Sequence, residues 1–245
     1  MILKNKNIFV TGAGKGIGLD TVKTAIKEGA FVYALTRSKT NIKELKKIKN
    51  SQFYFGNVAD NKIIKKIFKD SINNKRLITG LVNNAGERQR MKFNKITSKD
   101  INKIFKANFF SIFNLMQLYS KYLSNKKFNA SIVNVGSIAG HLGFSELSGY
   151  ASTKAALAGL TKSFAVEMVN NNIRANIVNP GFTKTSFYKK FKRKRKLYNW
   201  TLSRIPMKRW GYSSEIAHLI CFLLSDRSSY INGESINIDG GWVNS

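Results

Sequence analysis

The sequence has few of the residues that build disulfides and zinc sites, with one cysteine, Cys221, and two histidines among 245 residues. A single cysteine excludes an internal disulfide, and its apolar, helix-like surroundings favour a packed thiol. So few thiols and imidazoles argue against a zinc site, and no metal is expected. Apolar runs of about 18 residues, which a transmembrane helix needs, are missing too. The first residues lack the apolar stretch of a signal peptide. These absences predict a soluble, cytoplasmic protein that has no membrane association.

Acidic residues are also scarce, with 13 Asp and Glu against 42 Lys and Arg, and the net charge is +29. Such an excess of positive charge could bind nucleic acid, a membrane surface or an acidic partner. Lysine and asparagine are abundant in nearly every segment, however, and proline occurs only twice. Because a nucleic-acid binder usually gathers its charge on one face, we expect biased residue usage and no specific nucleic-acid site.

Buried strand-like segments alternate with amphipathic segments along the whole chain, with short connections and no linker. This alternation predicts an α/β fold of the Rossmann type, a doubly wound parallel sheet of about seven strands with helices on both faces. The length of the chain suits a single large α/β domain over 1–245. Strands are expected at 7–10, 30–36, 52–55, 80–83, 130–135, 174–179 and 234–238, and helices at 16–28, 41–49, 61–73, 96–124, 149–170 and 213–224.

A glycine-rich loop follows the first expected strand and opens the first helix. Glycines there permit a tight turn and a close approach of backbone to a pyrophosphate, whose charge the helix N-terminus favours. We therefore expect a dinucleotide to contact Gly12, Gly14, Lys15, Gly16, Ile17 and Gly18.

The second expected strand ends in Thr36-Arg37-Ser38 and carries no carboxylate. NAD-specific sites of this type place an acidic residue there, which accepts from the ribose 2′-hydroxyl. Arg37 instead offers a planar donor fork suited to a phosphate, and Lys15 adds a second cation. This end of the site predicts NADP(H) in preference to NAD(H).

Tyr150 and Lys154 lie four residues apart in an expected helix, which puts them on one face. A cation beside a phenol favours the phenolate, so we expect a lowered pKa for Tyr150 and a role in acid/base catalysis. Ser137 follows the strand at 130–135, at the sheet edge where open α/β sheets bind ligands. Alone, this tyrosine–lysine spacing is more often a solvated helix face.

Taken together, these motifs resemble the short-chain dehydrogenase/reductase family over essentially the whole chain. Asn83-Asn84-Ala85-Gly86 is similar to the family motif beside the cofactor, and the segment with Pro180, Gly181, Thr183 and Thr185 resembles the one at the nicotinamide end. The resemblance places the family's catalytic tetrad on Asn108, Ser137, Tyr150 and Lys154. It implies hydride transfer between a nicotinamide and a carbonyl or secondary alcohol carbon, in a homotetramer.

The resemblance implies that Tyr150 would donate the proton to the carbonyl oxygen of the substrate and that Ser137 would donate a hydrogen bond to the same oxygen. Lys154 would hold the nicotinamide ribose, and Asn108 would position a water that links Lys154 to solvent. Where many relatives have an aspartate facing the adenine, this chain has Asn57, which is expected to contact the cofactor together with Val58. Glu87 replaces the usual apolar residue after the glycine and is followed by Arg88-Gln89-Arg90. These charges are expected near the mouth of the site, and no role is assigned to them. His141, four after Ser137, is a candidate for substrate contact.

The substrate segment is expected at 182–207, and it contains seven cations in the eight positions 189–196. This run could be a solvated helix face, a surface that attracts an acidic partner such as acyl carrier protein, or a non-specific nucleic-acid contact. The resemblance favours a 3-oxoacyl-(acyl-carrier-protein) reductase, and a carbonyl or xylulose reductase acting on a sugar, polyol or small dicarbonyl is the alternative. A non-catalytic NADP-binding module and a basic nucleic-acid-binding protein are the hypotheses from other classes.

Overall fold

The computed structural model describes residues 1–38, 45–124, 128–185 and 188–245. Residues 41–44 of the helix predicted at 41–49 therefore lie outside the described residues. Within them, no helix is both long and apolar enough to cross a bilayer.

Seven parallel strands form the central sheet, in the order β3-β2-β1-β4-β5-β6-β9. The chain runs outward from β1 in one direction and from β4 in the other, so the order reverses between these two strands. This confirms the predicted doubly wound fold, in which ligands bind outside the carboxyl ends of the strands at the reversal. The strands are β1 (Asn7–Thr11), β2 (Phe31–Thr36), β3 (Ser51–Phe55), β4 (Gly80–Asn83), β5 (Ala130–Val135), β6 (Ile173–Pro180) and β9 (Ser235–Ile238).

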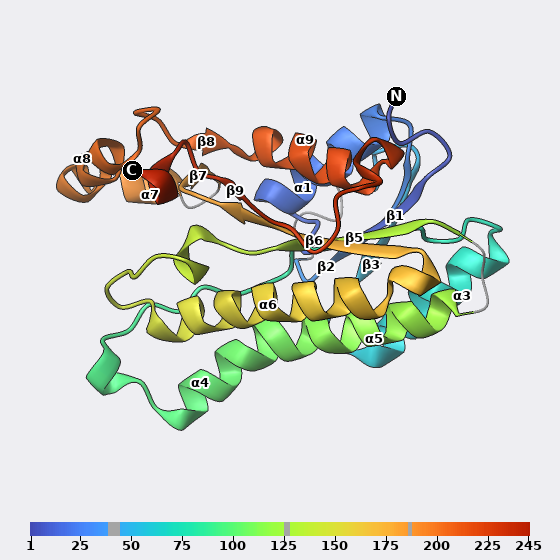
Figure 1. Cartoon of the computed structure of the whole chain (residues 1–245), viewed down its shortest axis with the longest axis horizontal. Helices are drawn as coiled ribbons and strands as arrows, with labels where there is room; N and C mark the ends of the chain where they lie inside the picture. The colour runs from blue at the N-terminus through green and yellow to red at the C-terminus, as the bar shows by residue number, and fades with distance from the viewer. Residues whose placement is uncertain (39–44, 125–127, 186–187) are drawn as a thin grey trace.

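Helices cover both faces of the sheet (Figure 1). On one face lie α1 (Gly16–Lys27) and α9 (Ser213–Leu224). On the other face lie α3 (Asn61–Asn73), α4 (Ser98–Phe105), α5 (Ser111–Leu123) and α6 (Ser148–Glu167). Each face has its own buried apolar cluster, because strands covered on both sides carry apolar residues at successive positions.

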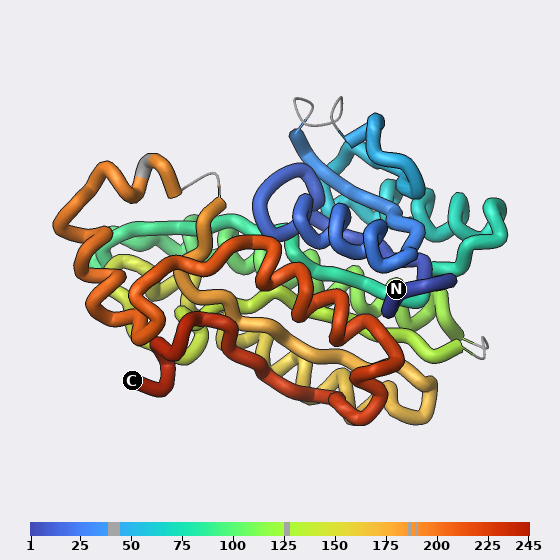
Figure 2. The backbone as a smooth tube through the Cα atoms, turned by 90° about the horizontal axis from the view of Figure 1, so that it is seen from above, coloured from blue at the N-terminus to red at the C-terminus, as the bar shows by residue number. Residues whose placement is uncertain are grey.

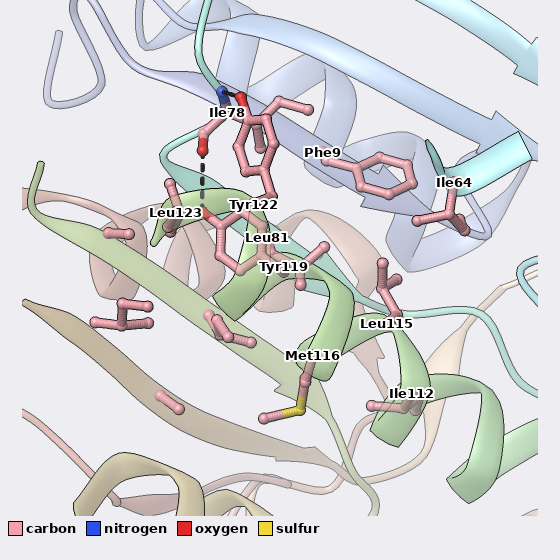
Figure 3. Packing of buried hydrophobic residues seen from close by; sticks show 14 of the residues in the cluster. Phe9, Ile64, Ile78, Leu81, Ile112, Leu115, Met116, Tyr119, Tyr122 and Leu123 are labelled. Carbon is pink, nitrogen blue, oxygen red and sulfur yellow. Dashed lines mark hydrogen bonds between the residues drawn. The ribbon is translucent and has the colours of Figure 1, made fainter. Parts of the chain in front are cut away.

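Two tyrosines of α5 fix the chain just before β4 (Figure 3). The backbone N–H of Ile78 donates to the Tyr122 hydroxyl at 2.9 Å, and the Tyr119 hydroxyl donates to the Ile78 carbonyl at 3.2 Å. All three residues are buried. Because buried backbone groups are costly when unpaired, these bonds set where β4 begins and so where its carboxyl end meets the site.

The helix predicted over 96–124 is interrupted by a π-helical turn, η2 (Lys106–Phe110), between α4 and α5. Such turns insert one residue into an α-helix and often occur at functional sites. Here the turn carries Asn108, whose side chain is fully buried and directed at the sheet edge. The prediction of one uninterrupted helix is wrong at this point.

A small appendage follows β6. Strand β7 (Thr183–Lys184) pairs with β8 (Gly211–Tyr212), and between them run α7 (Tyr188–Lys192) and α8 (Arg195–Arg204). Both helices lie near the C-terminus, at one end of the molecule (Figures 1 and 2). A separate aromatic core holds them, with Phe191, Trp210 and Trp242 buried at its centre. The substrate segment is thus a packed unit attached to the sheet edge.

Candidate active site

Two connected hollows form one groove along the carboxyl ends of the strands. A cleft of about 420 Å³, here called the catalytic cleft, contains Ser137, Tyr150 and Lys154. A second hollow of about 570 Å³, here called the adenosine groove, contains Arg37 and Asn57. The two share four lining residues, Lys15, Asn84, Gly86 and Glu87. The groove therefore crosses the reversal between β1 and β4, where this fold binds dinucleotides.

The glycine loop is tied to the end of β4. The Thr11 hydroxyl accepts from the backbone N–H groups of Asn84 and Ala85 at 3.1 Å, and the Asn84 amide donates to the Thr11 and Gly12 carbonyls at 3.1 Å. Gly12 has a φ of +64°, and a Cβ there would lie 2.8 Å from the Asn84 amide nitrogen. Both the conformation and the contact require glycine. The loop thus brings bare backbone and the N-terminus of α1 to the groove, which fits a pyrophosphate.

The predicted cofactor residues gather along this groove. Gly12, Gly14, Lys15, Arg37, Ser38, Asn57, Val58, Asn84, Ala85 and Gly86 line the adenosine groove. Gly16, Ile17, Pro180, Gly181, Thr183 and Thr185 line the catalytic cleft. Gly18 lies instead behind the loop, against the Gly12 carbonyl and the Asn84 amide, where a side chain would not fit. The adenosine groove also contains Lys103 and Lys106, which sequence analysis missed because only the packing of α4 and η2 brings them there.

Arg37 does not stand alone at the adenosine end. Its Nη1 lies 2.9 Å from Oε1 of Glu87, fifty residues later in the chain. Glu87 in turn is held by Asn108, which accepts from its backbone N–H at 2.7 Å and donates to its carbonyl at 2.8 Å. The cation expected to bind a 2′-phosphate is therefore paired with a carboxylate whose backbone the tetrad asparagine fixes.

Ser137, Tyr150 and Lys154 meet in the catalytic cleft. Ser137 follows β5, and the other two lie one turn apart on α6, which confirms that they share a face. The Lys154 ammonium donates to the Val135 carbonyl at 2.7 Å and lies 5.8 Å from the Tyr150 ring centroid. Burial lowers the pKa of Lys154 to about 8, because the low-dielectric surroundings disfavour its charged form.

The pKa of Tyr150 differs from the expectation. Burial raises it above the ordinary value of 10.0, while a hydrogen bond with Ser137 and the positive charge of Arg88 act in the opposite direction. The prediction of a lowered pKa is wrong for the protein by itself, because desolvation of the phenolate outweighs its favourable neighbours. The cation that acts to lower the pKa of Tyr150 is Arg88, to which sequence analysis assigned no role. The Lys154 ammonium donates a hydrogen bond to the Val135 carbonyl.

Asn108 and His141 differ in where they lie. Asn108 is buried and also donates to the Thr153 hydroxyl at 3.2 Å, so its amide joins η2, α6 and the segment after β4. The water that it was expected to position stays a prediction. His141 is exposed and lies outside the lining of the catalytic cleft, with Nε2 3.5 Å from the Ser235 hydroxyl. The structure does not bring it to the other candidate substrate residues.

The catalytic cleft has two further kinds of lining: an apolar wall, which sequence analysis missed, and a charge from the segment that it expected near the mouth of the site without a role. Phe144, Leu147, Phe182 and Trp210 give it an apolar wall. Arg88 places a guanidinium in it. Aromatic residues at 144, 182 and 210 come from separate segments and carry no spacing that would have indicated a common wall. Among the described residues, no group of three or more histidine, cysteine and acidic side chains is placed to hold a metal.

Known proteins resemble this chain over nearly its full length. A family model described as enoyl-(acyl carrier protein) reductase matches residues 12–243. The 3-oxoacyl-(acyl-carrier-protein) reductase FabG of Thermotoga maritima is 37% identical, over 99% of this chain and 100% of its own. The 2-dehydro-3-deoxy-D-gluconate 5-dehydrogenase of Bacillus subtilis is 31% identical, over 98% of this chain and 96% of its own.

Among solved structures, 4-hydroxyisoleucine dehydrogenase complexed with NADH matches with a TM-score of 0.91 and 27% identity, over 98% of this chain and 99% of that one. It shares the seven-stranded parallel architecture described above. A family model that spans most of the chain and a relative at 37% identity point the same way. This chain belongs to the short-chain dehydrogenase/reductase family, whose members are oxidoreductases acting on CH–OH and C=O groups with a nicotinamide cofactor.

Proposed function

We propose that this enzyme is an NADP(H)-dependent reductase in which residues 1–245 act as one catalytic unit, with a 3-oxoacyl chain on acyl carrier protein as the leading substrate. The observation that carries the proposal is the meeting of Ser137, Tyr150 and Lys154 in a cleft with an apolar wall, continuous with a dinucleotide groove. The FabG relative, at 37% identity over the whole chain, supports the substrate class.

The chemistry divides among the three side chains. A bound nicotinamide dinucleotide supplies the hydride. Tyr150 gives the proton of its hydroxyl to the substrate's carbonyl oxygen, as a general acid. Ser137 donates a hydrogen bond to the same oxygen, where negative charge develops. Lys154, which is buried with its ammonium 5.8 Å from the Tyr150 ring centroid, would bind the ribose hydroxyls of the cofactor and would hold a positive charge near the developing phenolate.

The preference for NADP(H) rests on Arg37 and Lys15 at the adenosine groove, and on the lack of a carboxylate in Thr36-Arg37-Ser38 at the end of β2. A 2′-phosphate would displace Glu87 from the Arg37 guanidinium. The phosphate dianion carries more charge than a carboxylate and has more acceptor oxygens for the planar guanidinium. A cytoplasmic location fits the proposal, because reduction of this kind draws on the cytoplasmic cofactor pool.

An acidic partner has a candidate surface in α7 and α8. Lys189 and residues 192–196 are exposed, and the appendage that carries them also contributes Phe182 and Trp210 to the cleft wall. A carrier protein docked there would lie close to the cleft mouth. A solvated face produced by biased composition is the alternative, and the spread of lysine over the rest of the chain favours it.

A homotetramer, which the family resemblance implies, would cover an apolar face on η2 and α5. Phe110 and Phe113 are exposed there, and their rings contact that of Phe109. Exposed aromatic groups of this kind are typical of interfaces. Light scattering of the purified protein tests this part of the proposal, and a monomer at micromolar concentration would refute it.

A second candidate function is a dehydrogenase or reductase of a sugar, polyol or small dicarbonyl. Arg88 in the catalytic cleft favours it, since a cation there suits a charged or hydroxyl-rich substrate better than an acyl chain. A non-catalytic NADP-binding module and a nucleic-acid-binding protein have less support, because the site keeps a complete set of proton-transfer groups. The deciding experiment is NADPH oxidation with an acetoacetyl carrier-protein mimic, a ketose and a small dicarbonyl. No oxidation with any of them would exclude both the leading substrate class and this second one.

A further inference from the structure

The four residues after Gly86 have different structural roles. Glu87 pairs with Arg37, as described above. The Gln89 side-chain amide donates to the Asp100 carbonyl at 3.4 Å. Arg90 pairs with Glu146, with 2.6 Å between Nε and Oε2. Glu87 and Arg88 both line the catalytic cleft, and Arg88 brings a positive charge to it beside Ser137 and Tyr150.

Arg88 and Tyr150 line the same cleft. The positive charge of Arg88 acts to lower the pKa of Tyr150. Desolvation in turn lowers the pKa of the Arg88 guanidinium, although the residue as a whole is exposed. Because the cleft carries this cation beside the proton donor, an anionic group of a substrate that enters the cleft can pair with the guanidinium.

The charge of the catalytic cleft is positive. Its cations are Lys15, Arg88 and Lys154, and of the described residues that line it Glu87 is the one carboxylate. That carboxylate is bonded to Arg37. The side chains that line the cleft therefore carry an excess of positive charge.

We infer that Arg88 is a specificity-determining residue that binds a carboxylate of the substrate, so that the enzyme acts on free oxo acids and hydroxy acids. The planar fork of a guanidinium pairs with a carboxylate through two parallel hydrogen bonds. The carbon chain would then lie along the apolar wall of Phe144 and Leu147 on the way to Ser137 and Tyr150. This inference rests on the proposed carbonyl reduction but replaces its leading substrate, a carrier-bound thioester, with a free acid.

A thioester satisfies Arg88 less well than a carboxylate does. Its carbonyl oxygen accepts hydrogen bonds but brings no charge, so part of the desolvated guanidinium would lose hydration without compensation. The same reasoning disfavours a neutral diketone. The preference for an acid over neutral probes is therefore the property that Arg88 should control.

The test uses the purified enzyme with NADPH and four probes: acetoacetate, 4-oxopentanoate, acetoacetyl-N-acetylcysteamine and 2,3-hexanedione. Wild type should reduce one of the two oxo acids with the highest kcat/KM. Arg88→Met should lower kcat/KM for that acid about 10- to 100-fold, the effect of one lost charge-assisted interaction, mainly through KM. The value for the neutral dione should change by less than about threefold, and Arg88→Lys should restore part of the loss.

Arg90→Met is the matched control, because it removes an arginine two residues away that pairs with Glu146 outside the cleft. It should leave all four values unchanged. Equal losses with all probes in Arg88→Met would assign Arg88 a structural or proton-transfer role and overturn the inference. A wild-type preference for the thioester would overturn it too. Turnover of the thioester or dione without any oxo acid refutes only the role of Arg88, whereas no turnover of any probe refutes the reductase itself.

Discussion

Arg37 at the end of β2 and Glu87 after β4 are joined across the adenosine groove, with 2.9 Å between Nη1 and Oε1. The pair lies where the sequence predicts a 2′-phosphate. A dinucleotide phosphate and the Glu87 carboxylate would therefore compete for the same guanidinium.

Glu87→Gln should therefore tighten NADPH binding. The substitution releases Arg37 and removes a negative charge beside the phosphate, while the amide keeps the size of the side chain. Because the ion pair is partly exposed, the gain should be modest, about two- to fivefold in Kd. A fluorescence titration with NADPH measures it. Glu146→Gln, which breaks the Arg90 pair away from the groove, is the control, and weaker NADPH binding in Glu87→Gln would contradict the competition.

Arg37→Leu should reverse the cofactor preference. Loss of the guanidinium should raise the Kd of NADPH roughly 10- to 100-fold, because hydrogen bonds between charged groups are the strong ones. The Kd of NADH, which has no 2′-phosphate, should change little and serves as the internal control. Equal effects on both cofactors would show that Arg37 supports the groove and does not read the phosphate.

Tyr150→Phe should abolish turnover and leave NADPH binding nearly intact. The ring that packs in the cleft is kept and only the proton donor is lost, which should cost at least about 100-fold in kcat. Single-turnover kinetics and a binding titration separate the two effects. Tyr230→Phe is the control, since Tyr230 is fully exposed. Retained turnover in Tyr150→Phe would remove this residue from its role.

Lys154→Met should change how stability depends on pH. In the folded protein the pKa of Lys154 is lowered to about 8, whereas an unfolded lysine has a pKa of about 10.4. Keeping the ammonium buried therefore costs the wild type about 3 kcal/mol below pH 8. This cost disappears as the pH rises from about 8 to 10.4, because the unfolded chain then binds more protons.

The measurement is urea unfolding of wild type and Lys154→Met without cofactor, between pH 7 and 10.5. The free energy of unfolding of the wild type should rise relative to the variant over this range. The loss of the bond to the Val135 carbonyl shifts the variant by a constant and does not affect the trend. A difference that stays flat across the range would show that Lys154 keeps its ordinary pKa.

Salt distinguishes the interpretations of the basic run at 189–196. If α7 and α8 attract an acidic carrier protein, raising the ionic strength should raise the KM of a carrier-bound substrate severalfold, since charged encounters are screened beyond about 8–10 Å. The KM of the small thioester acetoacetyl-N-acetylcysteamine should stay constant and provides the control. Absence of a salt effect on the carrier-bound substrate would favour a solvated face.

Sequence predicted most of the architecture because its signals are local. The helix at Asn61–Asn73 was predicted with its observed bounds, since apolar residues recur on one face and Asp60 caps its first turn. The strand at Gly80–Asn83 was likewise correct. The prediction that Ser137, Tyr150 and Lys154 lie close together is correct. A strand end and a spacing of one helical turn can both be recognised within a short segment.

The features that the sequence did not reveal depend on contacts between distant segments. The Arg37–Glu87 pair joins residues fifty positions apart, and each cation in so basic a chain looks alike in sequence. The raised pKa of Tyr150 depends on burial, which no spacing expresses. The π-helical turn was missed because its apolar pattern also fits an ordinary α-helix over so few residues.

The π-helical turn η2 contributes to two surfaces that have different roles. The wide turn takes up one extra residue, so deleting one residue within Lys106–Phe110 would restore an ordinary α-helical turn. The residues of this stretch would then take new places around the helix, so Asn108 could no longer hold Glu87 and Thr153, and the Phe110 ring would leave its outward position near Phe113. The helical phase of this one stretch thus sets both the inner polar contact and the outer aromatic face, and neither can be shifted without the other.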